Sequence, residues 1–102
     1  MVIRLRIYHS EMADHEEADK IFYTHVKPVH EKHGAIFKGR YRDANGKVVV
    51  LWEYENERNL KRVQKMVSND VESMKYKNLR QEKGLHGISF DEYILKSTDQ
   101  KF

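Results

Sequence analysis

One histidine and five aromatic residues of this sequence could form a site for a small molecule. In a helix across residues 14–34, a rotation of about 100° per residue places His25 within the apolar arc that Ile21 and Val29 define. An imidazole that faces a core can act as a general acid or base near neutral pH. We therefore predict a candidate catalytic role for His25. The predicted substrate-binding residues are Phe22, His25, Phe37, Tyr41, Trp52 and Tyr54.

The same residues have a simpler interpretation. A His on an apolar helix face is commonly a hydrogen-bonded core residue, and large aromatic side chains dominate the cores of small domains. Under this alternative the protein's own side chains fill the interior, and no ligand is bound.

The sequence does not indicate a metal site or a cofactor site. His30 and His33 lie three residues apart, but no carboxylate or third His stands at a telling distance from them. Protonated histidines near the C-terminal end of a helix also interact favourably with its dipole. The chain has no Cys, which excludes disulfides and thiolate ligands. We expect no metal and no cofactor.

The elements that must position the predicted site follow from the hydrophobic periods. Residues 2–9 alternate as a strand does, and a helix is expected from Asp14, with Glu17 completing a capping box, to Gly34. Pro28 should kink this helix because it removes one internal hydrogen bond.

A hairpin is predicted next, with strands at 36–42 and 47–54. Asn45 and Gly46 between them favour a type I′ turn. Asn56 can cap a second helix, which is expected to break at 68–70 and to continue until Gly84. Residues 87–96 form the last predicted strand, and 97–102 a frayed tail.

This order, β-α-β-β-α-β, predicts a single α+β domain over residues 1–102 with a ferredoxin-like fold. Two helices should cover one face of an antiparallel sheet in which the first strand lies between the third and the fourth. The other sheet face is then left open.

The composition of the open face predicts a homodimer. We expect Ile3, Leu5 and Ile7 to face the helices. The open face would be charged as well as apolar, with Arg6 pairing Glu53, and burial against a second copy would cover it. The alternative is a solvated sheet with ordinary surface ion pairs. The predicted dimer-face residues are Arg4, Arg6, Tyr8, Arg40, Val49, Leu51 and Glu53.

Charge and hydropathy bear on the other partners. The net charge is only +3, because 19 Lys and Arg are interleaved with 16 Asp and Glu, so we expect no nucleic-acid partner. No apolar run approaches the roughly 18 residues of a membrane span. We expect a cytoplasmic protein without membrane contact, in keeping with the lack of Cys.

Three segments give the chain a resemblance to the NIPSNAP family of the dimeric α+β barrel superfamily. They are residues 5–8 (Leu-Arg-Ile-Tyr), residues 26–34, which end in Lys-His-Gly, and residues 50–54 (Val-Leu-Trp-Glu-Tyr). Gly39, Tyr41 and Arg58 match further family positions. The resemblance implies that two sheets meet in a dimeric barrel, and that small molecules lie between the helices and the concave sheet. The biochemical role of the family is poorly defined.

Three functions therefore stay open. The first is a homodimer that binds a small hydrophobic or aromatic molecule. The second is a cofactor-independent or haem-related monooxygenase, or an isomerase, as in related barrels. The haem-degrading relatives carry an Asn, a Trp and a His at set places, of which this chain has only Trp52. The third is a structural or regulatory dimer without a ligand.

Overall fold

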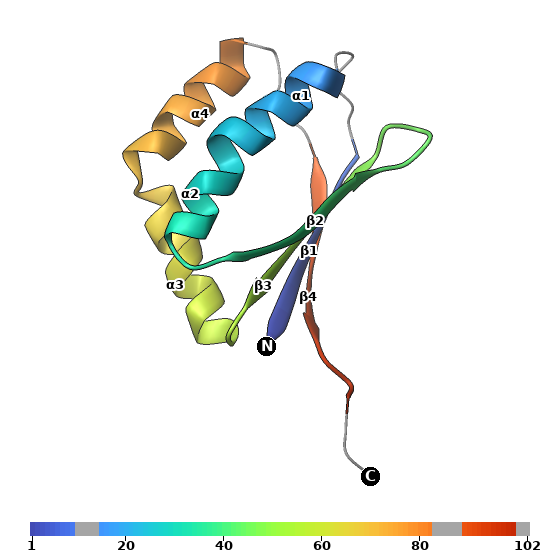
Figure 1. Ribbon diagram of the computed structural model, residues 1–102, viewed down its shortest axis with the longest axis vertical. Helices are drawn as coiled ribbons and strands as arrows, with labels where there is room; N and C mark the ends of the chain where they lie inside the picture. The colour runs from blue at the N-terminus through green and yellow to red at the C-terminus, as the bar shows by residue number, and fades with distance from the viewer. Residues whose placement is uncertain (10–14, 83–88, 100–102) are drawn as a thin grey trace.

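The protein folds into two layers, a four-stranded antiparallel sheet and a set of helices that covers one of its faces (Figure 1). The computed structural model describes residues 1–9, 15–82 and 89–99. The strands are β1 (Val2–Tyr8), β2 (Ile36–Arg42), β3 (Val48–Tyr54) and β4 (Phe90–Lys96). Their order in the sheet is β2-β3-β1-β4, so the predicted α+β, ferredoxin-like class and the place of the first strand are confirmed.

The first helical segment is not uniform. It consists of α1 (His15–Ile21), a π-helical turn η1 (Phe22–Val26) and α2 (Lys27–Lys32). The backbone N–H of Lys27 donates to the carbonyl of Phe22, five residues earlier, which is the hydrogen bond of a π-turn. The wide turn comes directly before Pro28, whose ring crowds the preceding turn and which has no N–H to donate. The predicted kink is thus realised as a π-turn. The predicted start at Asp14 lies outside the described residues.

The segment ends where the sequence predicts. Gly34 has φ +110°, and the N–H groups of Gly34 and Ala35 donate to the carbonyls of Glu31 and His30 at 3.1 and 3.0 Å. This is a Schellman motif, which needs a residue with positive φ after the helix.

The second predicted helix is divided into two helices, and the break between them lies within the predicted residues 68–70. They are α3 (Glu57–Ser68) and α4 (Val71–Glu82). The side chain of Asn56 accepts from the N–H of Asn59 at 2.8 Å and caps α3. Asp70 accepts from the N–H of Glu72 at 2.9 Å and caps α4. Gly84, the predicted end, lies outside the described residues.

The hairpin turn differs from the prediction. A type I′ turn needs positive φ at both central residues, but in the described chain only glycines have positive φ, among them Gly46 at +86°. The carboxylate of Asp43 instead accepts from the N–H groups of Asn45 and Lys47, both at 2.9 Å. Because this Asp side chain satisfies the loop amides, the strands are joined by a longer loop over 43–47.

The alternation predicted for β1 is correct, but its direction is reversed. Arg4 lies opposite Trp52 and Arg6 opposite Val50, on the face that the helices cover. Leu5 lies opposite Leu51 on the open face. The reason is that Trp52 and Tyr54, at 2% and 0% exposure, lie on the helix side of β3. Residues paired across the strands share a face, and the period of two then fixes the face of every other residue of β1. One contiguous cluster of the buried core consists of Val2, Ala35, Val50, Trp52, Tyr54, Leu60 and Val63.

This reversal corrects part of the predicted dimer face. Four of its members lie on the helix-covered side: Arg4, Arg6, Tyr8 and Arg40. Val49, Leu51 and Glu53 lie on the open face, as predicted. The predicted pairing of Arg6 with Glu53 is wrong, because Arg6 binds Glu92 instead. On β2, a bulge between Phe37 and Gly39 shifts the alternation and turns Arg40 toward the helices.

Candidate functional site

Three aromatic side chains meet between the helices and the sheet, one each from η1, β2 and β3. Trp52 has ring centroids 6.1 Å from Phe22 and 5.3 Å from Phe37, and the two phenylalanines are 5.8 Å apart. All three are predicted substrate-binding residues. Trp52 is almost fully buried, whereas Phe22 and Phe37 are only half-buried.

His30 completes this aromatic cluster from α2. Its ring stacks on Trp52, with centroids 4.7 Å apart and an angle of 16° between the planes. Its Nδ1 lies 2.9 Å from the carbonyl of Val26, so Nδ1–H donates and Nε2 keeps its lone pair. Burial lowers the pKa of His30 to about 4; the Val26 bond opposes the shift, and the charges of Arg4 and Arg6 add to it. The imidazole is therefore neutral at pH 7.

Two arginines of β1 stand beside the cluster and share one carboxylate. Nε of Arg6 donates to Oε1 of Glu92 at 2.8 Å, and Nη1 of Arg4 lies 3.7 Å from the same oxygen. The Arg6 guanidinium also lies 4.4 Å over the ring of Phe90. Burial lowers the pKa of Arg4, which is 2% exposed, but an arginine keeps its charge at any physiological pH.

Two buried polar atoms of this region have no hydrogen-bond partner among the described residues. They are Nε of Arg4 and the hydroxyl of Tyr54. The Arg4 guanidinium lies 5.8 Å from the centre of the Tyr54 ring, so the two atoms belong to neighbouring side chains. Burial raises the pKa of Tyr54, and the phenol stays protonated. Buried polar groups are rarely left unsatisfied, so both atoms call for a ligand, an ion or water.

A second ionic cluster fastens α1 to the far end of β2. Asp19 binds Arg40 and Arg42, with its Oδ1 2.7 Å from Nη2 of Arg42. These hydrogen bonds, led by that of Arg42, hold the pKa of Asp19 at about 2. The Arg40 guanidinium also lies 5.0 Å from the centre of the Phe22 ring and so borders the aromatic cluster.

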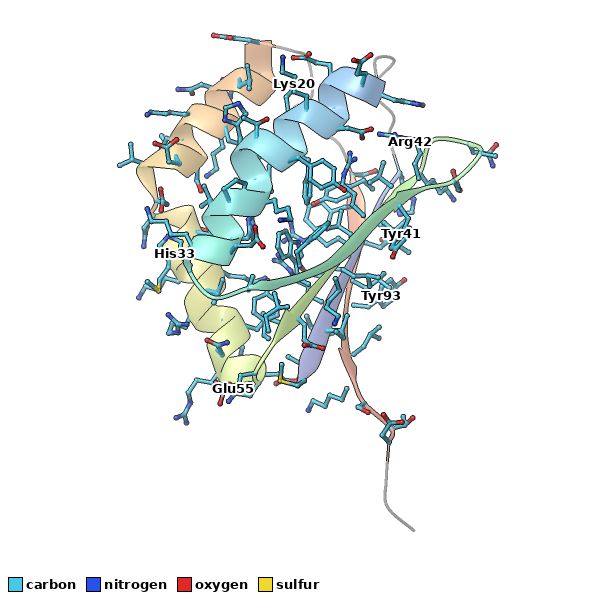
Figure 2. All side chains as sticks on the ribbon, in the orientation of Figure 1. Lys20, His33, Tyr41, Arg42, Glu55 and Tyr93 are labelled. Carbon is cyan, nitrogen blue, oxygen red and sulfur yellow. The ribbon has the colours of Figure 1, made fainter. Side chains whose placement is uncertain are left out.

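The other predicted site residues lie outside the aromatic cluster. Tyr41 is 61% exposed on the open face, where its ring covers Gly39, and Figure 2 shows it on the side away from the helices. Tyr54 lies on the helix side, two residues beyond Trp52. His25 is half-buried, and the rings that contact Trp52 are those of Phe22, His30 and Phe37. Its catalytic role stays a prediction.

Sequence reasoning missed His30 and the two arginines. The π-turn between Ile21 and Pro28 changes the phase of α2 from that of a regular helix with 3.6 residues per turn, so His30 reaches Trp52 while Val29 stays buried. Pro28 was the available signal. His33, three residues on, points to the helical layer instead and binds Asp70 at 2.7 Å (Figure 2).

In the segments 1–9, 15–82 and 89–99, no three His, Cys, Asp or Glu side chains come together as metal ligands. No helix in these segments has the length and apolar character needed to span a membrane.

Comparison with solved structures relates this fold to NIPSNAP proteins. An uncharacterized NIPSNAP-like domain protein from Burkholderia xenovorans superposes with a TM-score of 0.79 at 16% identity, over 98% of this chain and 87% of that chain. A NIPSNAP family protein with unknown function from Agrobacterium tumefaciens gives 0.78 at 13% identity, over 95% and 87%. A de novo designed protein with a ferredoxin fold gives 0.57 at 12% identity, over 100% and 91%.

At these identities the likeness establishes the fold. No protein-family model matches the chain, and no curated protein matches it. The resemblance drawn from the sequence motifs and the structural likeness both lead to NIPSNAP proteins.

Proposed function

We propose that this chain is a NIPSNAP-like protein that acts as a homodimer and binds a small hydrophobic or aromatic molecule between its first helical segment and the sheet. The structural likeness and the motifs in β1, α2 and β3 support the family. These NIPSNAP proteins are themselves uncharacterized or of unknown function, so the likeness suggests no reaction for this chain.

The ligand site is supported by the stack of His30 on Trp52 together with the unsatisfied atoms beside it. Phe22 and Phe37 flank the stack, and both are only half-buried. Small-molecule sites combine such apolar surfaces with a few polar groups that orient the ligand. A core that served stability alone would place methyl groups where Arg4 and Tyr54 bury polar atoms without a partner.

The dimer is supported by the open face of the sheet. Its side chains are mainly apolar, and several are largely exposed in the single chain: Tyr93 at 51%, Leu95 at 44%, Ile36 at 46% and Tyr41 at 61%. β4 is an edge strand, and all seven of its residues are exposed. Monomeric proteins rarely leave a contiguous apolar face or a long edge strand uncovered, and a second copy of the same sheet would cover both.

A co-purified ligand is the most direct test of the site. The purified protein is analysed by native mass spectrometry, and the bound fraction is then extracted into organic solvent and identified. We expect a mass above that of the polypeptide, carried by an extractable apolar or aromatic compound.

Variants then connect the ligand with the site. Phe22→Ala removes one wall of the aromatic cluster and should reduce the bound fraction at least five-fold, whereas Met74→Ala, on the exposed face of α4, should leave it unchanged. A wild-type crystal structure with a filled interior, and with no adduct by mass spectrometry, would instead support a structural dimer.

A further inference from the structure

The helix-facing side of β1 buries more positive than negative charge. Arg4 and Arg6 present two guanidinium groups, and in the described part of the chain a single carboxylate, that of Glu92, pairs with either of them. One oxygen of this carboxylate faces both groups, at 3.7 Å from Arg4 and 2.8 Å from Arg6. A buried charge without its own counter-ion is costly, so this surface lacks an anion.

The unsatisfied atoms beside the arginines are both hydrogen-bond donors. Arginine Nε–H can only donate, and the protonated phenol of Tyr54 has a hydrogen to donate. Two donors without partners require acceptor oxygens, which a carboxylate or sulfonate group supplies in a pair. A further cation or an aliphatic group would leave both donors unsatisfied.

The surroundings of the arginines favour an apolar body on this anion. The neutral, stacked pair of His30 and Trp52 lies on one side of them. On the other side, the ring of Phe90 lies beneath Arg6 and is 44% exposed, and Ile94 on the same strand is 41% exposed. The exposed edge strand β4 provides an approach from solvent. On this strand, Glu92 is the carboxylate that already pairs with Arg4 and Arg6.

We propose that the site takes an organic anion, with an aromatic or apolar body against Trp52 and Phe90 and a carboxylate or sulfonate head on Arg4, Arg6 and the Tyr54 hydroxyl. This inference rests on the proposed function, because it names the chemical class of the molecule bound at the same site.

Two dyes with a common skeleton test the charge. 8-Anilinonaphthalene-1-sulfonate is anionic, and N-phenyl-1-naphthylamine is its neutral counterpart. Trp52 is the only Trp of the chain, so energy transfer from it reports a dye bound nearby. Arg6→Gln should weaken binding of the sulfonate at least five-fold and change binding of the neutral dye less than two-fold. Lys61→Gln removes one exposed charge from α3 and is the matched control, expected to alter neither.

A second measurement uses the wild-type protein and does not depend on a variant's folding. The protein is titrated with acid in the presence of benzenesulfonate or of benzenesulfonamide. Protonation of His30 is followed through the emission of Trp52, excited at 295 nm. His30 is faced by Arg4 and Arg6 from β1, by His33 on its own helix and by the Val26 carbonyl. An anion bound to the arginines offsets their repulsion and should raise the midpoint by at least about half a pH unit. Benzenesulfonamide should leave it unchanged.

The possible results separate the two proposals. If both dyes accept energy from Trp52 and Arg6→Gln affects neither, the anionic class is wrong and the small-molecule site stands. If neither dye accepts energy from Trp52, both the class and the site are rejected. A midpoint that benzenesulfonate and benzenesulfonamide move equally also overturns the anionic class.

Discussion

At the scale of single residues, His30 illustrates how burial decides the state of a titratable group. Its ring is held by the stack on Trp52 and by the hydrogen bond to Val26, and both arrangements suit the neutral form with the proton on Nδ1. Desolvation and two neighbouring arginines then make the charged form costly. His30 is thus a neutral acceptor at physiological pH and not a source of positive charge.

This state can be measured through Trp52. A charge gained 4.7 Å from the indole should change its emission, with a midpoint at about pH 4. His30→Phe keeps a stacked ring and should abolish the transition, whereas His25→Phe should retain it. A midpoint near 6.5 in the folded protein would mean that His30 is hydrated.

The same shift has a consequence for stability. The pKa of His30 is lowered from its ordinary value of 6.5 to about 4 in the folded protein, so the unfolded chain binds a proton more readily. The stabilising contribution is therefore fully present above pH 6.5 and is lost as the pH falls toward 4. In His30→Phe the free energy of unfolding should depend less on pH across this window, as seen in urea unfolding at several pH values.

At the scale of elements, the first helical segment carries most of the site through its irregularities. Phe22, the first residue of the π-turn η1, lies in the cluster, and the Schellman motif at Gly34 leads the chain into β2. π-turns within helices are frequent at functional sites. Here the π-turn lies next to Pro28, and together they set the direction in which His30 faces the sheet.

Gly34 is the position where this segment is most sensitive to substitution. It has φ +110°, and a Cβ added there would lie 3.3 Å from Nη2 of Arg62. Gly34→Ala should lower the free energy of unfolding by about 1–2 kcal/mol, because residues with a Cβ disfavour positive φ. Gly34→Asn should cause a smaller loss of unfolding free energy, since Asn tolerates positive φ better than most residues other than glycine. Urea unfolding measures both, and an equal loss in the two variants would assign the cost to crowding by Arg62.

At the scale of the whole molecule, the sheet has two unlike faces. The helices cover one face, which buries arginines together with aromatic rings, and the other face is apolar and open (Figure 1). Figure 2 places Tyr41 and Tyr93 on this open side. The arginines of β1 lie on the helix-covered face, and Ile3, Leu5 and Ile7 lie on the open face, the reverse of the prediction. The open face is therefore less charged than predicted, which strengthens the argument that a second copy covers it.

Sedimentation velocity tests the dimer. At micromolar concentration we expect a particle of twice the 12.2 kDa mass of one chain. Leu51→Arg places a charge in the middle of the open face, opposite Leu5, and should yield monomers. Met74→Arg adds the same charge on exposed α4 and should leave the dimer intact. A wild-type protein that sediments as one chain would reject the dimer.

The sequence by itself determined the elements, their order and the fold class, because these depend on local signals. The period of two in residues 2–8, the cap at Asn56 and the glycine at 34 each act over a few neighbouring residues, and the structure has all three. The order of these elements was also enough to predict the ferredoxin-like sheet with β1 inside it.

Only the tertiary structure decided which side of each element faces the helices. A period tells which residues share a face, but not which face is covered; in β1 this was decided by the register that pairs Arg4 with the buried Trp52. The bulge in β2 turned Tyr41 outward, and the π-turn brought His30 to Trp52. One extra residue in a strand or a helix changes every later orientation, and packing across the whole molecule selects where it is placed.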